Sequence, residues 1–413
     1  MTLTRRTTTI LIVFTVLNAF LPRTGNAEDY MERLLKGASR VMVKTEGDRS
    51  QVYLPAISIT PNTGLTVGVL PVWLRLHPSG KIRKIFAPSL TYNEIFGWTP
   101  TLRYFHYPSA NTTLFALASK SVTANERYAV RLTDFDAFGT GGRLRLEFNQ
   151  ESKGAMRFFG IGSTSPESAE SDYTLKKTLL FADMGLPMWG GGQIIAGWKV
   201  RRADIRAGSL DSLRDIAVNR RGAATVSGPR VGYFRDTRNF PSTPTRGTLA
   251  DISANFYRKV LGSDEDFINV RAEFRGYRKH AKADAILAGR VLIERSGWGN
   301  VPFAYLVRLG GEKLLRGYGV ARFVDRGIAV AGIEERISMY RLKMMGSTVD
   351  FQIAPFLEVG TVFDSLTDLN HERALWAAGV AFRGVVTPSV VGRVEFGLGA
   401  EGSSTFVGID YPF

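Results

Sequence analysis

The stretch VVGRVEFGLGAE, residues 390–401, decides the fold. Its apolar side chains fall on every second position, at Val390, Val394, Phe396, Leu398 and Ala400. Its charged side chains, Arg393, Glu395 and Glu401, fall on the positions between them. Successive side chains of a strand point to opposite faces, so this stretch is predicted to be a strand with one apolar and one charged face.

The same alternation recurs in DFINVRAEFRGYRK (266–279) and GGRLRLEFN (141–149). The polar face of a soluble sandwich would mix serine, threonine and lysine. Here that face carries dense opposite charges, which is typical of the wall of a water-filled lumen, where water and mutual pairing solvate the charges. The other face is small and aliphatic enough to meet lipid. We therefore predict an all-β fold, a closed antiparallel transmembrane β-barrel.

The chain of 413 residues shows no linker or compositional shift that would divide it. A barrel of about 16 strands accounts for its length. There are 18 candidate segments: 54–60, 64–76, 84–94, 97–107, 112–121, 127–135, 142–152, 172–185, 191–205, 228–236, 247–260, 266–280, 284–296, 326–340, 349–363, 375–387, 390–400 and 404–413. We favour 16 strands, because segment 54–60 is short and contains Pro55.

Residues 1–27 are predicted to be a secretory signal peptide, with Arg5 and Arg6 before the apolar run 10–21 and small residues at the cleavage site. Residues 28–49 carry a stripe at helical spacing: Met31, Leu34, Leu35, Ala38, Val41 and Met42. We expect a short periplasmic segment, helical, that rests at the barrel mouth or plugs the lumen. The barrel is expected to span 50–413.

An even strand number places both ends of the barrel in the periplasm. The long connections 153–171, 206–227 and 297–325 then lie on the outer face. The last residues, TFVGIDYPF, place Val407, Ile409, Tyr411 and Phe413 on one apolar face of a final strand.

The third of these connections contains GGEKLLRGYG, residues 310–319, with Arg316, Gly317 and Tyr318 at its centre. LLRGYG resembles the Arg-Gly-Phe/Tyr motif of the outer-membrane assembly-factor superfamily, the BamA/TamA-type surface-antigen barrels. Further stretches resemble that family's motifs in the expected order: RFFGIGSTSPESAESDYT (157–174), GPRVGYFRDTRNFPSTPTRG (228–247), GIEERI (332–337) and FLEVGTVFD (356–364). The likeness covers most of 50–413.

The resemblance implies that the sixth outer loop folds into the lumen and that Arg316 pairs with an acidic residue of the wall. Glu358, in FLEVGTVFD, stands where the family usually has aspartate. Alternation independently places Glu358 and Gly360 on the lumen face of their strand, and Glu334 and Arg336 on the lumen face of theirs. An arginine matches a carboxylate with paired donors, which lysine cannot do.

The resemblance also implies a bacterial outer-membrane location, contact with lipid and lipopolysaccharide, and recognition of Val407, Ile409, Tyr411 and Phe413 by the outer-membrane assembly machinery. It implies a role in outer-membrane biogenesis or macromolecule translocation. The sequence contains no metal-ligand cluster and no phosphate-binding glycine loop, so we expect neither a cofactor nor a metal. Members that handle client proteins carry periplasmic polypeptide-transport-associated domains. Residues 28–49 are too few for one, so we expect that a separate periplasmic partner supplies this module.

Two other classes of function fit the sequence less well. A passive porin-like channel suits the charged lumen, but an in-folded loop would occlude it. An outer-membrane hydrolase would need a triad, and His106 near Ser109 has no carboxylate placed to orient it. The net charge of +15 does not indicate nucleic acid, because the basic residues alternate with aliphatic ones along strands.

Overall fold

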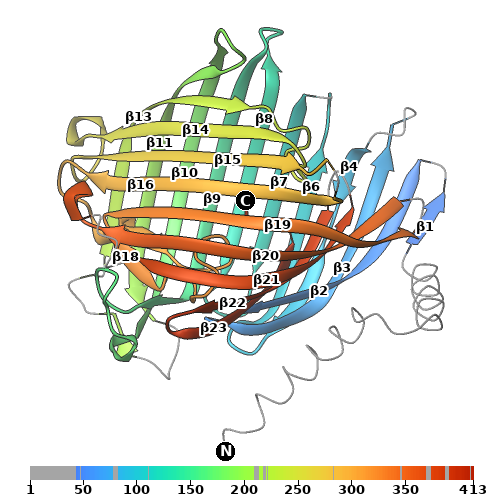
Figure 1. Cartoon of the computed structure of the whole chain (residues 1–413). Coiled ribbons are helices and arrows are strands. Elements are labelled where there is room, and N and C mark those ends of the chain that lie inside the picture. The colour runs from blue at the N-terminus through green and yellow to red at the C-terminus, as the bar shows by residue number, and fades with distance from the viewer. Residues whose placement is uncertain are drawn as a thin grey trace, which may run out of the picture.

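The computed structural model describes residues 43–46, 48–77, 82–109, 111–208, 214–216, 220, 222–281, 283–344, 347–368, 374–386, 390–409 and 411–413. They form a closed antiparallel barrel of 18 strands, in which each strand pairs with its neighbours in sequence (Figure 1). None of the helices among these residues is long and apolar enough to cross a membrane.

The wall consists of the following strands in chain order: β2 (Arg49–Thr60), β3 (Gly64–Leu76), β4 (Ile82–Phe86) with β5 (Ser89–Asn93), β6 (Gly97–His106), β7 (Thr112–Lys120), β8 (Glu126–Ala137), β9 (Gly142–Phe158), β10 (Ser171–Pro187), β11 (Gln193–Ala207), β13 (Gly222–Asp236), β14 (Gly247–Tyr257), β15 (Phe267–Lys279), β16 (Ala285–Gly297), β19 (Gly327–Met344), β20 (Ser347–Phe363), β21 (Leu375–Val386), β22 (Val390–Gly399) and β23 (Gly402–Ile409). β4 and β5 are two halves of one interrupted strand, since both pair with β3 and with β6.

The remaining elements are short. β1 (Val43–Glu46) pairs with the start of β2, and β12 (Arg214–Asp215) pairs with the start of β10. β17 (Val307–Leu309) and β18 (Phe323–Asp325) form a separate two-stranded ribbon. The 3₁₀ turns are η1 (Glu167–Ala169), η3 (Lys259–Leu261), η4 (Phe303–Tyr305) and η5 (Leu366–Asp368).

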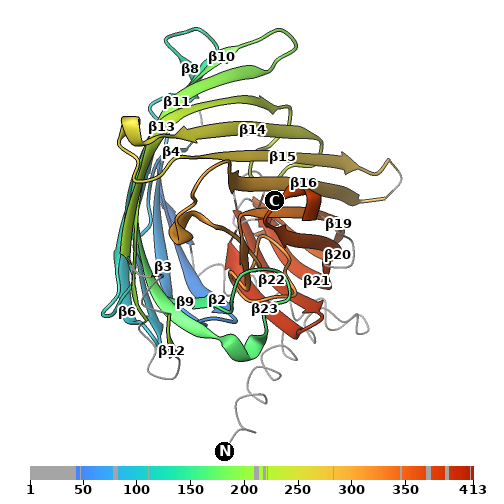
Figure 2. The ribbon, with the colours of Figure 1, turned by 90° about the vertical axis from the view of Figure 1, so that its left-hand side faces the viewer.

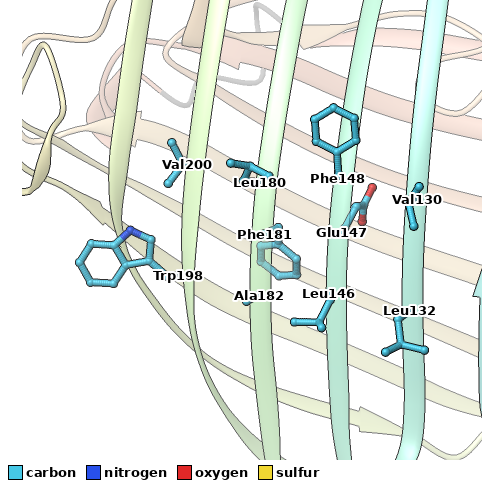
Figure 3. Close-up of a pocket in the computed structure, with 10 residues that line it drawn as sticks. All are labelled: Val130, Leu132, Leu146, Glu147, Phe148, Leu180, Phe181, Ala182, Trp198 and Val200. Carbon is cyan, nitrogen blue, oxygen red and sulfur yellow. The ribbon is translucent and has the colours of Figure 1, made fainter.

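The two faces of the wall differ as the alternation predicts. On β20, Leu357 and Val359 are exposed on the outside, while Glu358 between them is buried in the lumen. Figure 3 shows part of the outer face, a shallow apolar depression over β8 to β11. Its lining includes Val130, Leu132, Leu146, Leu180, Trp198 and Val200. This is the face expected to meet lipid.

The barrel closes at a thin seam between β2 and β23. Among the described residues, Ile59 with Val407 is the one register pair that joins these strands. β2 pairs with β3 along its whole length, and β1 covers the other edge of β2 from Arg49 to Val52. The wall is therefore least bonded where its first and last strands meet.

The barrel has 18 strands rather than the favoured 16, and every candidate segment contributes a strand to the wall. Segment 54–60 belongs to β2 despite Pro55, because a proline is tolerated where a strand lacks a full ladder on one edge. Strand pairing starts at Val43, before the predicted boundary at residue 50. Residues 1–42 lie outside the described residues, so the predicted signal peptide and the helical stripe 31–42 stay predictions.

Two of the three long connections are shorter than predicted, because their flanking strands continue further. β9 runs on to Phe158 through an irregularity at Ala155, which has a φ of 57° and breaks the alternation. β13 begins at Gly222. The connection between β16 and β19, residues 298–326, remains long and lies inside the barrel (Figure 2).

Candidate functional site

The segment 298–326, which we call the lumen loop, packs against the inner wall with two apolar clusters. Ala304 and Tyr305 join lumen residues of β10, β11, β13 and β15, such as Tyr173 and Phe267. Leu309, Leu315, Tyr318 and Phe323 join lumen residues of β16, β19, β20 and β21. The loop thus spans the inside of the barrel and is held on both sides.

Arg316 lies at the centre of the loop's contact with the wall and is fully buried. Its Nε donates to Glu358 Oε1 at 3.0 Å, and its backbone N–H donates to Glu358 Oε2 at 2.7 Å. Its Nη1 donates to Glu334 at 3.1 Å and to Glu395 at 3.0 Å. The guanidinium also lies over the ring of Phe356, 3.6 Å from its centre. One arginine therefore contacts carboxylates from β19, β20 and β22.

Three further arginines extend this network along the wall. Both Nη atoms of Arg383 donate to Glu334, at 2.8 Å each. Arg336 Nε donates to Glu334 at 2.7 Å. Arg393 Nη1 donates to Glu395, and its Nη2 reaches Glu312 of the loop at 2.9 Å.

We call this network the anchor. It comprises Arg316, Arg336, Arg383, Arg393, Glu312, Glu334, Glu358 and Glu395, so it carries as many cations as anions. Buried ions are tolerated only when they are paired and hydrogen-bonded. Burial alone would lower the pKa of Arg316, but the three carboxylates around it hold that pKa above its ordinary value. The anchor is therefore a fixed set of charges in which every ion depends on its partners.

Glycines let the loop backbone approach the wall. A Cβ on Gly397 of β22 would lie 2.2 Å from the carbonyl oxygen of Arg316, and one on Gly317 would lie 2.6 Å from the carbonyl oxygen of Leu398. A Cβ on Gly399 would meet the ring of Tyr318 at 2.7 Å. The turn itself is made elsewhere than at Gly317, since Gly310 and Gly311 have φ of 109° and 115°. Gly317 is needed for contact rather than for bending.

A second set of bonds ties the loop to both sides of the seam. Asn62, in the turn after β2, exchanges two hydrogen bonds with the backbone of Val320, at 2.9 and 3.0 Å. Arg322 forms a bidentate pair with Glu401, in the turn before β23, at 2.6 and 2.8 Å. It also donates to Ser165 of the connection between β9 and β10. The lumen loop therefore bridges the first and last strands at one end of the barrel.

The chain's last residues turn away from the wall. β23 ends at Ile409, and Tyr411 and Phe413 are buried inside the barrel, where Figure 1 places the C-terminus. Arg336 stacks on Tyr411 at 3.8 Å from the ring centre and donates to the Phe413 backbone oxygen at 3.1 Å. The expected single strand face through Tyr411 and Phe413 is thus corrected: Val407 lies on β23, and the two aromatic residues pack beside the anchor.

Comparisons with known proteins identify the family of this chain. The Omp85 superfamily domain matches residues 111–400, more than half of the chain. The chain belongs to the Omp85 superfamily. This membership and the barrel fold make it a bacterial outer-membrane protein.

Individual Omp85 relatives are distant. The outer membrane protein assembly factor BamA of Nitratidesulfovibrio vulgaris is 26% identical over 215 residues, which cover 50% of this chain and 26% of that protein. The chain thus spans about a quarter of the length of this curated relative.

Two solved structures show the same fold. BamA from Haemophilus ducreyi, in a form that lacks POTRA domains 1–3, aligns with a TM-score of 0.56 and 14% identity over 96% of this chain and 82% of that one. CdiB from Acinetobacter baumannii aligns with a TM-score of 0.51 and 14% identity, over 89% of this chain and 60% of that one.

The structure places the predicted site residues of this Omp85 barrel as follows. Arg316, Glu334, Arg336 and Glu358 meet in the anchor, and Tyr318 packs within the loop cluster, edge-on to Phe323 at 5.2 Å. Gly360 lies beside Leu309 of the loop, so it is part of the apolar contact between the loop and the wall rather than of the anchor.

Sequence reasoning did not assign Glu312, Arg383, Arg393 or Glu395 to the site. The alternation in 390–401 did mark Arg393 and Glu395 as lumen-facing, but it carries no information on which wall charges meet the loop.

Proposed function

We propose that this protein is a non-enzymatic assembly or translocation barrel of the outer membrane, acting in outer-membrane biogenesis or in moving a macromolecule across that membrane. Membership of the Omp85 superfamily supports the proposal, as does the similarity of half the chain to a protein named as an outer-membrane assembly factor.

The observation that carries the proposal is the thin seam together with the loop that bridges it. β2 and β23 share the Ile59–Val407 register pair alone among the described residues, while the loop bonds to Asn62 on one side and Glu401 on the other. Separating the two strands would expose two unpaired edges, to which a client segment could add backbone hydrogen bonds. A few bonds, rather than a whole ladder, oppose that separation.

A passive porin is the alternative that the charged lumen first suggested. The lumen loop crosses the inside of the barrel and is bonded to the wall at the anchor. Nothing among the described residues favours a steady open pore. We therefore keep the assembly or translocation role as the single proposal.

The partners that we propose follow from the outer-membrane location of the protein and from its proposed assembly or translocation role. Outer-membrane lipid and lipopolysaccharide surround the apolar outer face. The outer-membrane assembly machinery would insert the chain during biogenesis, reading the segment of Val407, Ile409, Tyr411 and Phe413. A separate periplasmic protein would deliver the client.

The test is deletion of the gene, followed by comparison of outer-membrane proteins, surface macromolecules and permeability. We expect loss of a specific protein or macromolecule from the outer membrane, restored by the wild-type chain. A control strain should carry the Arg326→Ala variant, because Arg326 forms an exposed ion pair with Asp364 outside the anchor. An unchanged outer-membrane composition together with reduced uptake of small solutes would contradict the proposal and favour a porin.

A further inference from the structure

The wall opposite the anchor carries an excess of positive charge. Its basic residues face the lumen from β9, β10, β11 and β13. We call them the basic wall: Arg143, Arg145, Lys177, Lys199, Arg201 and Arg230. The net positive charge of the sequence is thus partly concentrated inside the barrel, where the anchor does not use it.

Three of these arginines share a single carboxylate oxygen. Asp183 Oδ2 lies 3.1 Å from Arg145, 3.5 Å from Arg143 and 3.5 Å from Arg230. The side chain of Asp183 is fully buried, and those of Arg143 and Arg230 are 8% exposed. Asp251 adds a second carboxylate, 3.6 Å from Arg230. Two carboxylates cannot balance three guanidiniums.

Donor atoms of this cluster lack partners. Among the described residues, the buried Nε atoms of Arg143, Arg145 and Arg230 have no hydrogen-bond acceptor. By contrast, on β15 and β16 Glu273 accepts from Arg271 and Arg275 at 2.7 Å, and Arg271 also reaches Glu294 at 2.8 Å. Single unsatisfied nitrogens also occur on Arg316, Arg383 and Arg393 of the anchor, but here three of them crowd around Asp183. A buried donor left unsatisfied is costly, so this crowding favours an additional acceptor in the cluster.

The lysines continue the positive surface. Lys199 lies over the ring of Phe181. The guanidinium of Arg145 lies over the same ring, 4.3 Å from its centre. Lys199 lies among Arg230, Arg201 and Arg145, with the carboxylate of Glu294 nearby. That carboxylate is already bonded to Arg271. The surface therefore extends over several strands and would hold more than one anionic group.

We propose that the basic wall binds a multiply phosphorylated ligand inside the barrel. A phosphate group offers three acceptor oxygens and nearly two charges, so it can give several guanidiniums separate acceptors, whereas three arginines share one oxygen of Asp183. The planar fork of arginine matches phosphate oxygens in pairs. The ligand's phosphates come either from a lipid headgroup or from a soluble polyphosphorylated molecule. The inference does not depend on the proposed assembly role.

The experiment is isothermal titration of the full chain, purified in a neutral detergent at low ionic strength, with sodium tripolyphosphate and with inorganic phosphate. Low salt is needed because screening weakens charge–charge attraction. We expect saturable binding of tripolyphosphate, at least tenfold tighter than that of phosphate. Absence of saturable binding for both would overturn the proposal.

Variants locate the site. Lys199→Gln and the double variant Arg143→Gln/Arg230→Gln should each weaken tripolyphosphate binding by tenfold or more. Asp183→Asn should strengthen it severalfold, because a competing negative charge is removed. The matched control is Arg275→Gln, a lumen arginine of β15 that is bonded to Glu273 at 2.7 Å and not to Glu294; it should bind within about twofold of the wild type. Equal weakening by the control, or no effect of Lys199→Gln, would overturn the assignment.

Competition separates the sources of phosphate. Displacement of tripolyphosphate by phosphatidylglycerol in mixed micelles, but not by phosphatidylcholine, would support a lipid headgroup. Displacement by neither lipid, with the variant pattern intact, would support a soluble ligand. Poly-glutamate that binds more tightly than tripolyphosphate and loses affinity in the same variants would overturn the phosphate assignment in favour of an acidic polypeptide. Heat-modifiable migration checks that each variant is folded.

Discussion

At the scale of single residues, Arg316 is where the lumen loop depends on the wall. Its removal would leave Glu358 buried without a cation, and breaking a buried ion pair in this way costs about 3–5 kcal/mol. The barrel keeps its ring of interstrand hydrogen bonds, which lipid makes obligatory. Arg316→Ala should therefore leave the barrel inserted and make the lumen loop sensitive to limited proteolysis.

Arg316→Lys should not restore protection, since one ammonium cannot reach carboxylates from β19, β20 and β22 with separate donor atoms. Arg326→Ala is the control and should digest like the wild type, because its ion pair is solvent-exposed. Identical digestion of all these proteins would mean that the loop is not held through Arg316.

Gly397 offers a second test at residue scale, independent of charge. Gly397→Ala would place a methyl group 2.2 Å from the Arg316 carbonyl oxygen, so the loop backbone must move away from β22. Gly392→Ala, on the same strand, has nothing within 4 Å of the added methyl. We expect protease sensitivity of the loop for the first variant alone, and equal sensitivity of the two would argue against close contact at Gly397.

At the scale of elements, the final strand and its aromatic end have different roles. Replacing both Tyr411 and Phe413 with alanine should lower the outer-membrane yield and the temperature at which the barrel unfolds in a heat-modifiable migration assay. Arg336 would lose the ring on which it stacks and the packed C-terminal residue to which it donates a hydrogen bond. Tyr411→Phe keeps the ring and loses only the bond from its hydroxyl to Gln352. It should lose much less stability, and wild-type migration and yield of the double alanine variant would contradict this account.

The strands could be predicted from the sequence because period two is a local signal. It located every wall segment and the lumen side of Glu358, Glu334 and Arg336. The alternation gave wrong predictions where contacts with residues far apart in the sequence determine the conformation. Tyr411 and Phe413 continue the alternation of Val407, yet their rings turn inward to Arg336. The presence of Arg383 and Glu312 in the anchor was not predicted. Alternation indicates which face of the wall a side chain lies on, but it does not indicate which residues across the lumen it contacts.

At the scale of the whole molecule, the barrel combines a continuous wall with one weak closure. Elsewhere the strands pair over most of their length, so the wall cannot separate without losing a ladder of hydrogen bonds. At the seam the loop's bonds to Asn62 and Glu401 supplement the one register pair found among the residues that the structure describes. We propose that these two strands separate when the protein works.

A disulfide across the seam tests that claim most directly. The chain has no native cysteine, and Ile59 and Val407 are direct antiparallel partners, a spacing that a disulfide can bridge. The control pair, Ile57→Cys with Val67→Cys, joins β2 to β3 within the continuous wall.

Each pair would be expressed in the deletion strain, and recovery of the lost outer-membrane component would be measured with and without reductant. We predict that the oxidised 59–407 pair fails to restore it, that reduction restores it, and that the control pair works in both states. Full recovery by the oxidised 59–407 pair would contradict the account.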